Sequence, residues 1–329
     1  MVPHGLMPFR PQGALRNGHL QSIFPSLPLQ RLAMWRRSAP LRRASEPVLL
    51  ECGGDVRLQA FHARPPAPDG RLAVLLHGWE GSADAAYILS LAQDLHDRGV
   101  EVVRVNLRDH GGTQHLNRGL FHSCRLEDVT GALQDIDRRW PGRRLWLVGF
   151  SLGGNFMLRA AASPVAPQLP LAGVVAISPV LDPARATLAL EHGLPVYRRY
   201  FIWKWSRSLR RKQRAWPGEY DFGELLRDAD LRRMTDRLVR RYTEFPSLEA
   251  YFEGYAITGQ RLAGLKVPAW LLTAKDDPII PAADLDRLAQ SPALKVFVTE
   301  HGGHTGFLER PLRPSWANQF VLAAMDSPG

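Results

Sequence analysis

Cysteine is scarce in this sequence, because its 329 residues contain only Cys52 and Cys124. Two distant cysteines argue against a disulfide framework and are typical of a reducing compartment, so we expect a cytoplasmic protein. No apolar run is long enough to cross a bilayer, and residues 1–8 lack the apolar stretch of a signal peptide, so we expect none. The histidines and acids show no zinc-type spacing such as H-E-x-x-H, and we expect neither a metal nor another cofactor.

Acidic residues are outnumbered by basic ones, 32 against 42, and nearly all of the formal net charge of +10 comes from arginine. The segment 197–214 contains no acidic residue, and Tyr197, Phe201, Trp205 and Leu209 recur in it every four positions. On a helix this spacing forms an apolar stripe flanked by cations. The stripe fits a helix packed on the core, and it also fits peripheral contact with an anionic membrane. No nucleic-acid-binding motif accompanies the charge, so no nucleic-acid partner is expected.

The most informative motif is Gly-Phe-Ser-Leu-Gly-Gly-Asn at 149–155, which places Ser151 directly after the apolar run 145–148. Residues 155–161 continue as a mostly apolar helix. A serine between a buried strand and a buried helix is typical of a nucleophile elbow, a strained turn that exposes the hydroxyl at the end of a parallel sheet. The flanking glycines fit this turn because it crowds the backbone. The alternative is a glycine-rich turn with an exposed serine.

In a nucleophile-elbow protein the acid and then the base follow the serine along the chain. The apolar run 267–274 reads as a strand and ends in the adjacent pair Asp276 and Asp277. A carboxylate at this point lies just past a strand end, where open α/β sheets place their sites. Because adjacent side chains diverge, only one of the two carboxylates can face a histidine, and their positions leave both open.

Two histidines compete for the role of base. The apolar run 293–299 reads as a strand, and His301 and His304 follow it. We favour His304, because Gly302-Gly303 before it and Gly306 after it give the loop freedom to bring an imidazole to the serine. His301, nearer the strand, reads as a structural histidine.

An oxyanion needs two backbone N–H donors, one after the nucleophile and one from the loop after the third strand. Leu152 supplies the first. The run 72–76 reads as that third strand, and His-Gly-Trp-Glu-Gly follows it at 77–81, which makes the N–H of Trp79 the second donor. The alternative for 77–81 is a plain strand-to-helix turn.

These motifs together resemble the YheT-like branch of the α/β-hydrolase superfamily, related to abhydrolase-domain esterases and monoacylglycerol lipases. In similar chains the residue before the loop proline carries the acid, which favours Asp277. Relatives usually have glycine where this chain has Cys124. The resemblance implies hydrolysis of carboxylic esters with short or medium acyl chains, a lipid-like small molecule as substrate. The matching segments are 16–25, 77–81, 106–112, 149–155, 274–278 and 301–307.

The expected mechanism follows from these roles. His304 takes the proton of Ser151 as the hydroxyl attacks a carbonyl, Asp277 orients the imidazole, and water hydrolyses the acyl-enzyme. A thioesterase would use the same chemistry. A non-catalytic, membrane-associated binding protein on the same scaffold is the alternative class, and the presence of serine, acid and histidine argues against it.

The chain organisation predicts an α/β-hydrolase fold, a mostly parallel twisted sheet flanked by helices. Residues 1–43 form an N-terminal arm without clear periodicity. The core is expected in two parts, 44–178 and 267–329, and its first part opens with a β-hairpin. Between them the strand–helix alternation stops, and we expect a helical lid insertion at 179–266.

Overall fold

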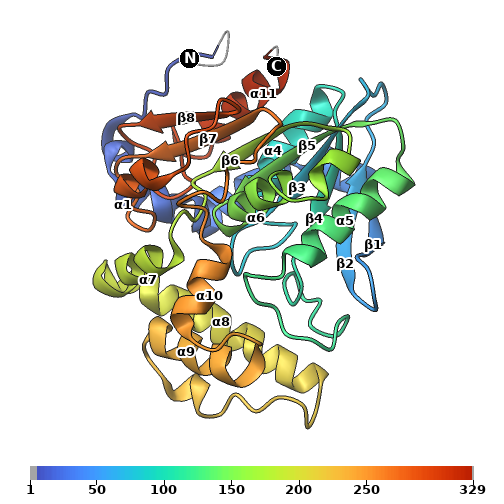
Figure 1. The fold of residues 1–329 in the computed structure, drawn as a ribbon. Coiled ribbons are helices and arrows are strands. Elements are labelled where there is room, and N and C mark those ends of the chain that lie inside the picture. The colour runs from blue at the N-terminus through green and yellow to red at the C-terminus, as the bar shows by residue number, and fades with distance from the viewer. Residues whose placement is uncertain (1–5, 328–329) are drawn as a thin grey trace.

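The computed structural model describes residues 6–327, and the core of this region is one eight-stranded sheet with the strand order β1-β2-β4-β3-β5-β6-β7-β8 (Figure 1). β1 and β2 form the predicted hairpin, and β2 is also antiparallel to β4, whereas all other neighbours are parallel. The predicted fold class is therefore confirmed. The strands are β1 (Ser45–Glu51), β2 (Arg57–Ala63), β3 (Arg71–Leu76), β4 (Glu101–Val105), β5 (Arg144–Phe150), β6 (Leu171–Ile177), β7 (Ala269–Ala274) and β8 (Leu294–Thr299).

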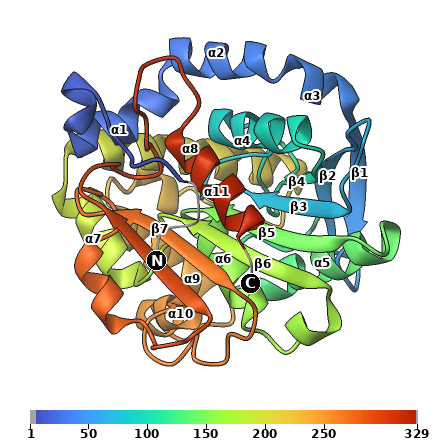
Figure 2. The ribbon, with the colours of Figure 1, turned by 90° about the horizontal axis from the view of Figure 1, so that it is seen from above.

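Helices cover both faces of the sheet (Figure 2). The central strands are apolar and buried along most of their length, as parallel strands covered on both sides must be. One face packs on α3 (Ala39–Ala44), α4 (Ala86–Asp97) and α11 (Trp316–Asp326), and α2 (Pro28–Arg37) lies on α4. The other face packs on α5 (Leu126–Arg139) and α6 (Leu152–Ala161). The carboxyl ends of the parallel strands meet at one edge of the sheet. The two helix layers cover the faces of the sheet and leave this edge open.

Most of the described part of the N-terminal arm, from Gly13 onward, is helical although its sequence shows no clear periodicity. Local start signals explain this, because the Asn17 side chain accepts hydrogen bonds from the first turn of α1 (Gly18–Ile23), and Pro28 is the first residue of α2. The buried Gln21 amide donates to the Leu308 carbonyl and accepts from the Leu308 N–H. The arm is thereby fastened to the loop that follows β8.

A helical insertion, defined here as residues 183–255, separates β6 from β7 and lies within the region where we expected a lid. Its helices are α7 (Pro183–His192), α8 (Pro195–Ala215), α9 (Leu231–Tyr242) and α10 (Leu248–Tyr255) (Figure 1). Tyr197, Trp205 and Leu209 of the predicted stripe are buried, so α8 packs this face inward. Within residues 6–327, every helix is too short or too polar to cross a membrane.

Candidate active site

Ser151 lies in the turn between β5 and α6, with φ 52° and ψ −120°. This conformation is strained for a residue with a side chain. The neighbouring glycines are required by contact distances, because a Cβ on Gly149 would lie 2.3 Å from the Gly153 carbonyl oxygen, and one on Gly153 would lie 2.3 Å from the Leu76 carbonyl oxygen. The turn thus holds the serine at the open edge of the sheet, as the motif predicts.

Three of the expected site residues form one hydrogen-bonded row. The Ser151 hydroxyl lies 2.9 Å from His304 Nε2, and His304 Nδ1 lies 2.9 Å from Asp277 Oδ2. The Asp277 side chain is fully buried, and its Oδ1 accepts the N–H groups of Ile279 and Ile280. With its proton on Nδ1, the His304 ring donates to Asp277 and presents a lone pair on Nε2 to the serine.

The adjacent acid and the second histidine point elsewhere. Asp276 Oδ1 accepts the N–H of Gly303, and Asp276 Oδ2 lies 3.6 Å from the partly exposed His301. Asp276 therefore braces the loop that carries His304, and His301 pairs with Asp276. Sequence reasoning missed a further support of this loop, the Ser22 hydroxyl of α1, which accepts the His304 N–H at 2.8 Å.

The loop after β3 lies against the serine. A Cβ on Gly78 would approach Ser151 Cβ to 3.1 Å. Leu152 is the first residue of α6, so its N–H has no intrahelical acceptor. Neither the Leu152 N–H nor the Trp79 N–H donates to an acceptor among residues 6–327. Both N–H groups are therefore available to an external acceptor.

His77 positions this loop, a role that the sequence did not reveal. Its ring is fully buried, which together with the nearby His110 lowers its pKa well below the usual value. The neutral ring donates from Nδ1 to the Gly78 carbonyl and accepts the Leu107 N–H on Nε2, at 2.7 and 3.2 Å. The loop after β3 is thus tied to the loop after β4.

Ser151 and His304 open into a cavity of about 790 Å³ between the core and the helical insertion. The sheet side is lined by residues such as Trp79, and the insertion contributes apolar side chains from all four of its helices. Within residues 6–327, no group of three or more His, Cys, Asp or Glu side chains is arranged to hold a metal ion. The hydrogen-bonded row of serine, histidine and carboxylate thus lies at the wall of a large and mainly apolar cavity.

A family model described as serine aminopeptidase, S33, matches residues 67–311. The chain belongs to this family of α/β-hydrolases. It is 26% identical over 308 residues to the YheT protein of Escherichia coli (strain K12), across 91% of this chain and 87% of the relative. It is 23% identical over 279 residues to the phospholipase ABHD3 of Mus musculus, across 82% of this chain and 67% of the relative. The resemblance inferred from the motifs is confirmed.

Solved structures agree on the fold of this hydrolase. The esterase Pf2001 of Pyrococcus furiosus superposes with a TM-score of 0.55 at 13% identity, across 85% of this chain and 91% of that one. At this identity the similarity establishes the architecture alone.

Helix α8 of the hydrolase contacts the loop that carries the expected oxyanion donor. Phe201 stacks on Trp79 with ring centroids 5.3 Å apart, and Trp205 meets the same ring edge-on at 5.3 Å. The Lys204 ammonium donates to the Glu80 carbonyl. Glu80 has φ 56°, so the loop is strained next to Trp79 and held in that shape by α8.

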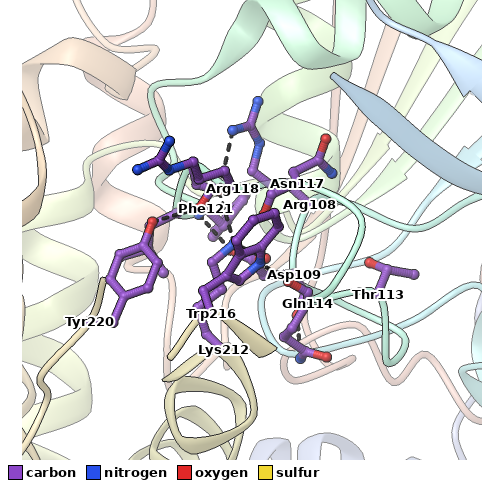
Figure 3. Close-up of polar contacts among 12 residues, drawn as sticks. Arg108, Asp109, Thr113, Gln114, Asn117, Arg118, Phe121, Lys212, Trp216 and Tyr220 are labelled. Carbon is purple, nitrogen blue, oxygen red and sulfur yellow. Dashed lines mark hydrogen bonds and ion pairs between the residues drawn. The ribbon is translucent and has the colours of Figure 1, made fainter. Parts of the chain in front are cut away.

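A buried ion pair fastens the C-terminal half of α8 to the loop after β4 (Figure 3). Lys212 Nζ lies 2.9 Å from Asp109 Oδ1 and also donates to the carbonyls of Asn117 and Gly119. Burial raises the pKa of Asp109 and lowers the pKa of Lys212. From the sequence, Lys212 looks like one more solvated cation of the segment 197–214. Only the structure shows that its side chain points inward and pairs with Asp109.

Arg108 and His110 of the same loop make structural contacts. Arg108 forms two 2.7 Å hydrogen bonds with Asp128. Burial lowers the pKa of His110 to about 4 and keeps its ring neutral, and its Nδ1 lies 2.7 Å from the Arg108 carbonyl oxygen. Burial raises the pKa of the Cys52 and Cys124 thiols to about 12, so neither is a reactive thiolate.

Proposed function

We propose that this protein is a serine esterase that cleaves carboxylic esters of lipid-like molecules through Ser151, His304 and Asp277. The observation that carries the proposal is the row of two 2.9 Å contacts from the Ser151 hydroxyl through His304 to Asp277, at the wall of a large cavity. These distances lie within the range needed for proton transfer from a nucleophile to its base.

In the proposed reaction His304 Nε2 accepts the Ser151 proton while the hydroxyl oxygen attacks the ester carbonyl. Asp277 keeps the proton of the neutral imidazole on Nδ1 and stabilises the imidazolium that forms. The N–H groups of Trp79 and Leu152 donate to the oxyanion, and each such donor contributes about 2.7–4 kcal/mol in related sites. His304 then protonates the alcohol that leaves, and water hydrolyses the acyl-enzyme through the same base.

The cavity favours an acyl chain as the part of the substrate that is bound. Its volume of about 790 Å³ lies in the usual range for pockets that enclose small-molecule ligands. Leu190, Leu231 and Leu238 of the insertion and Ile279 and Ile280 after β7 line it. In this proposal the helical insertion is the lid. The relative named phospholipase ABHD3 supports an ester of a fatty acid as the substrate class.

The test compares the purified wild type with Ser151→Ala. We expect the wild type to hydrolyse p-nitrophenyl esters and to be labelled by a fluorophosphonate, and we expect Ser151→Ala to lose both reactions by at least a thousandfold. Matching circular dichroism spectra would show that the variant is folded. Medium-chain p-nitrophenyl esters should give a lower KM than p-nitrophenyl acetate, because the cavity wall is apolar.

Three results would overturn the proposal. The first is equal ester hydrolysis by wild type and Ser151→Ala. The second is an absence of hydrolysis and labelling in the folded wild type, as a non-catalytic binding protein would show. The third is turnover of aminoacyl p-nitroanilides or acyl thioesters without turnover of oxygen esters, which would move the activity to a peptidase or a thioesterase.

A further inference from the structure

The outward face of α8 changes character along its length. Val196, Tyr200 and Trp203 follow one another at helical spacing and are 49%, 41% and 57% exposed. The same face continues with arginines only. A cluster of exposed apolar side chains on a surface helix is typical of an interaction surface. We call the exposed side chains of α8 between Val196 and Arg214 the α8 outer face. Its exposed arginines are Arg199, Arg207, Arg210, Arg211 and Arg214.

These arginines lack acidic partners. Within residues 6–327 none of the five has a carboxylate oxygen within 4.0 Å. Helix α9, equally rich in arginine, shows the opposite arrangement, because each of its arginines forms an ion pair. The general arginine content of the chain therefore does not explain the α8 outer face. The α9 pairs are Arg232–Glu249, Arg233–Asp228, Arg237–Asp228, Arg240–Asp236 and Arg241–Asp221.

The α8 outer face borders the mouth of the active-site cavity. Tyr200, Arg207 and Arg211 line the cavity and are also exposed, so the cavity reaches the solvent beside them. On the inner side of the same helix, Phe201 and Trp205 contact Trp79 beside Ser151. One helix thus joins an exposed cationic and aromatic surface to the entrance of the candidate site.

We propose that the α8 outer face docks on the surface of an anionic lipid bilayer. Tyr200 and Trp203 lie at the level of the headgroups, with their rings toward the acyl chains, and the arginines contact lipid phosphates. The cavity mouth then faces the lipid from which an ester substrate enters. Docking itself does not require hydrolysis, whereas the delivery of an ester rests on the function proposed above. Val196 and the neighbouring exposed Leu194 favour a bilayer over a nucleic acid, since aliphatic groups gain by leaving water for lipid.

The test is co-sedimentation of the full-length protein with vesicles of equal parts phosphatidylcholine and phosphatidylglycerol, and with vesicles of phosphatidylcholine alone. The variant Arg199→Gln/Arg210→Gln/Arg214→Gln removes three cations that do not line the cavity. It should weaken binding to the anionic vesicles by on the order of a hundredfold, because each arginine near such a surface contributes several-fold. Trp203→Ala should weaken binding by about tenfold.

The matched control is Arg233→Gln/Arg240→Gln/Arg241→Gln on α9, which makes the same change in net charge at exposed positions. It should bind the vesicles like the wild type, and raised salt should release the wild type. Wild-type binding to the anionic vesicles but not to phosphatidylcholine alone would support docking.

Several outcomes would overturn the proposal. Equal losses in the α8 and α9 variants would assign binding to net charge alone. No vesicle binding at low salt would exclude the surface as a docking site, and binding to an oligonucleotide that the α8 variant loses, with vesicle binding retained, would assign the face to nucleic acid. Ser151→Ala should dock like the wild type, so failure of the proposed hydrolysis and failure of docking are told apart.

Discussion

Replacing Lys212 by methionine tests how α8 is held on the core. Lys212 and Asp109 are 1% and 4% exposed, and the ammonium makes three contacts, with Asp109 Oδ1 and with the carbonyls of Asn117 and Gly119. Asp109 Oδ2 also accepts the Phe121 N–H. The methionine fills a similar volume but leaves a buried carboxylate without its counter-charge (Figure 3).

Coulomb's law at the observed 2.9 Å separation and an effective dielectric constant of about 20 gives an attraction of about 6 kcal/mol. Desolvation of both groups offsets part of this attraction. We therefore expect Lys212→Met to lower the free energy of unfolding by about 3–5 kcal/mol, as removal of one partner of a buried pair does. The loss should shrink at low pH, because burial already raises the pKa of Asp109, and its neutral form needs no cation.

The assay is urea unfolding followed by tryptophan fluorescence, together with kcat and KM for a p-nitrophenyl ester. The partner variant is Asp109→Asn, chosen because asparagine tolerates the φ of 59° at this position and keeps an acceptor for Phe121. The double variant Asp109→Asn/Lys212→Met should lose less stability than Lys212→Met alone. Arg240→Met, which breaks an exposed pair with Asp236, should cost less than about 1 kcal/mol.

The expected contribution of the buried pair would be refuted if the free energy of unfolding of Lys212→Met lay within about 1 kcal/mol of the wild-type value. It would also be refuted if the losses in the double variant were additive, because then the two groups would not interact. A loss of stability with unchanged kcat and KM would show that the anchor supports the fold without shaping the cavity.

The remaining predictions concern the site itself. Asp277→Asn should lower kcat by up to about 10⁴-fold, whereas Asp276→Asn should change it by less than about tenfold, because an amide oxygen still braces the histidine loop; equal effects would contradict the observed geometry. Gly78→Ala places a Cβ 3.1 Å from Ser151 Cβ and should lower kcat on the order of tenfold with little change in KM, measured by steady-state kinetics. Burial raises the pKa of the Glu80 carboxyl from 4.5 to about 7, so the folded state holds this proton longer than the unfolded state does. The wild type should therefore lose stability relative to Glu80→Gln as the pH rises from about 4.5 to about 7, and parallel urea-unfolding curves across this pH range would contradict it.

Sequence reasoning reached the fold and the neighbourhood of the site because both depend on local patterns. A short apolar run followed by a glycine-flanked serine predicts the turn at Ser151 without knowledge of any contact. The carboxyl ends of parallel strands meet at one edge, so the order serine, acid, histidine was enough to bring 276–277 and 301–304 to that edge. The helices of the N-terminal arm escaped prediction because they show no clear amphipathic period, and short start signals such as Asn17 and Pro28 are the main local marks of where they begin.

Local pattern could not say which of two neighbouring groups faces inward. Asp276 and Asp277 differ by one position, and the turn after β7 alone directs the second toward His304 and the first toward Gly303. The cations of α8 look alike along the chain, yet Lys212 is buried against Asp109, while Arg210 and Arg214 have no acidic partner within residues 6–327. Hydrophobic periodicity is a property of contiguous residues. The direction of a side chain depends on the exact turn that carries it, and the pairing of a charge depends on a partner that is distant in the sequence, 103 positions away for Lys212 and Asp109.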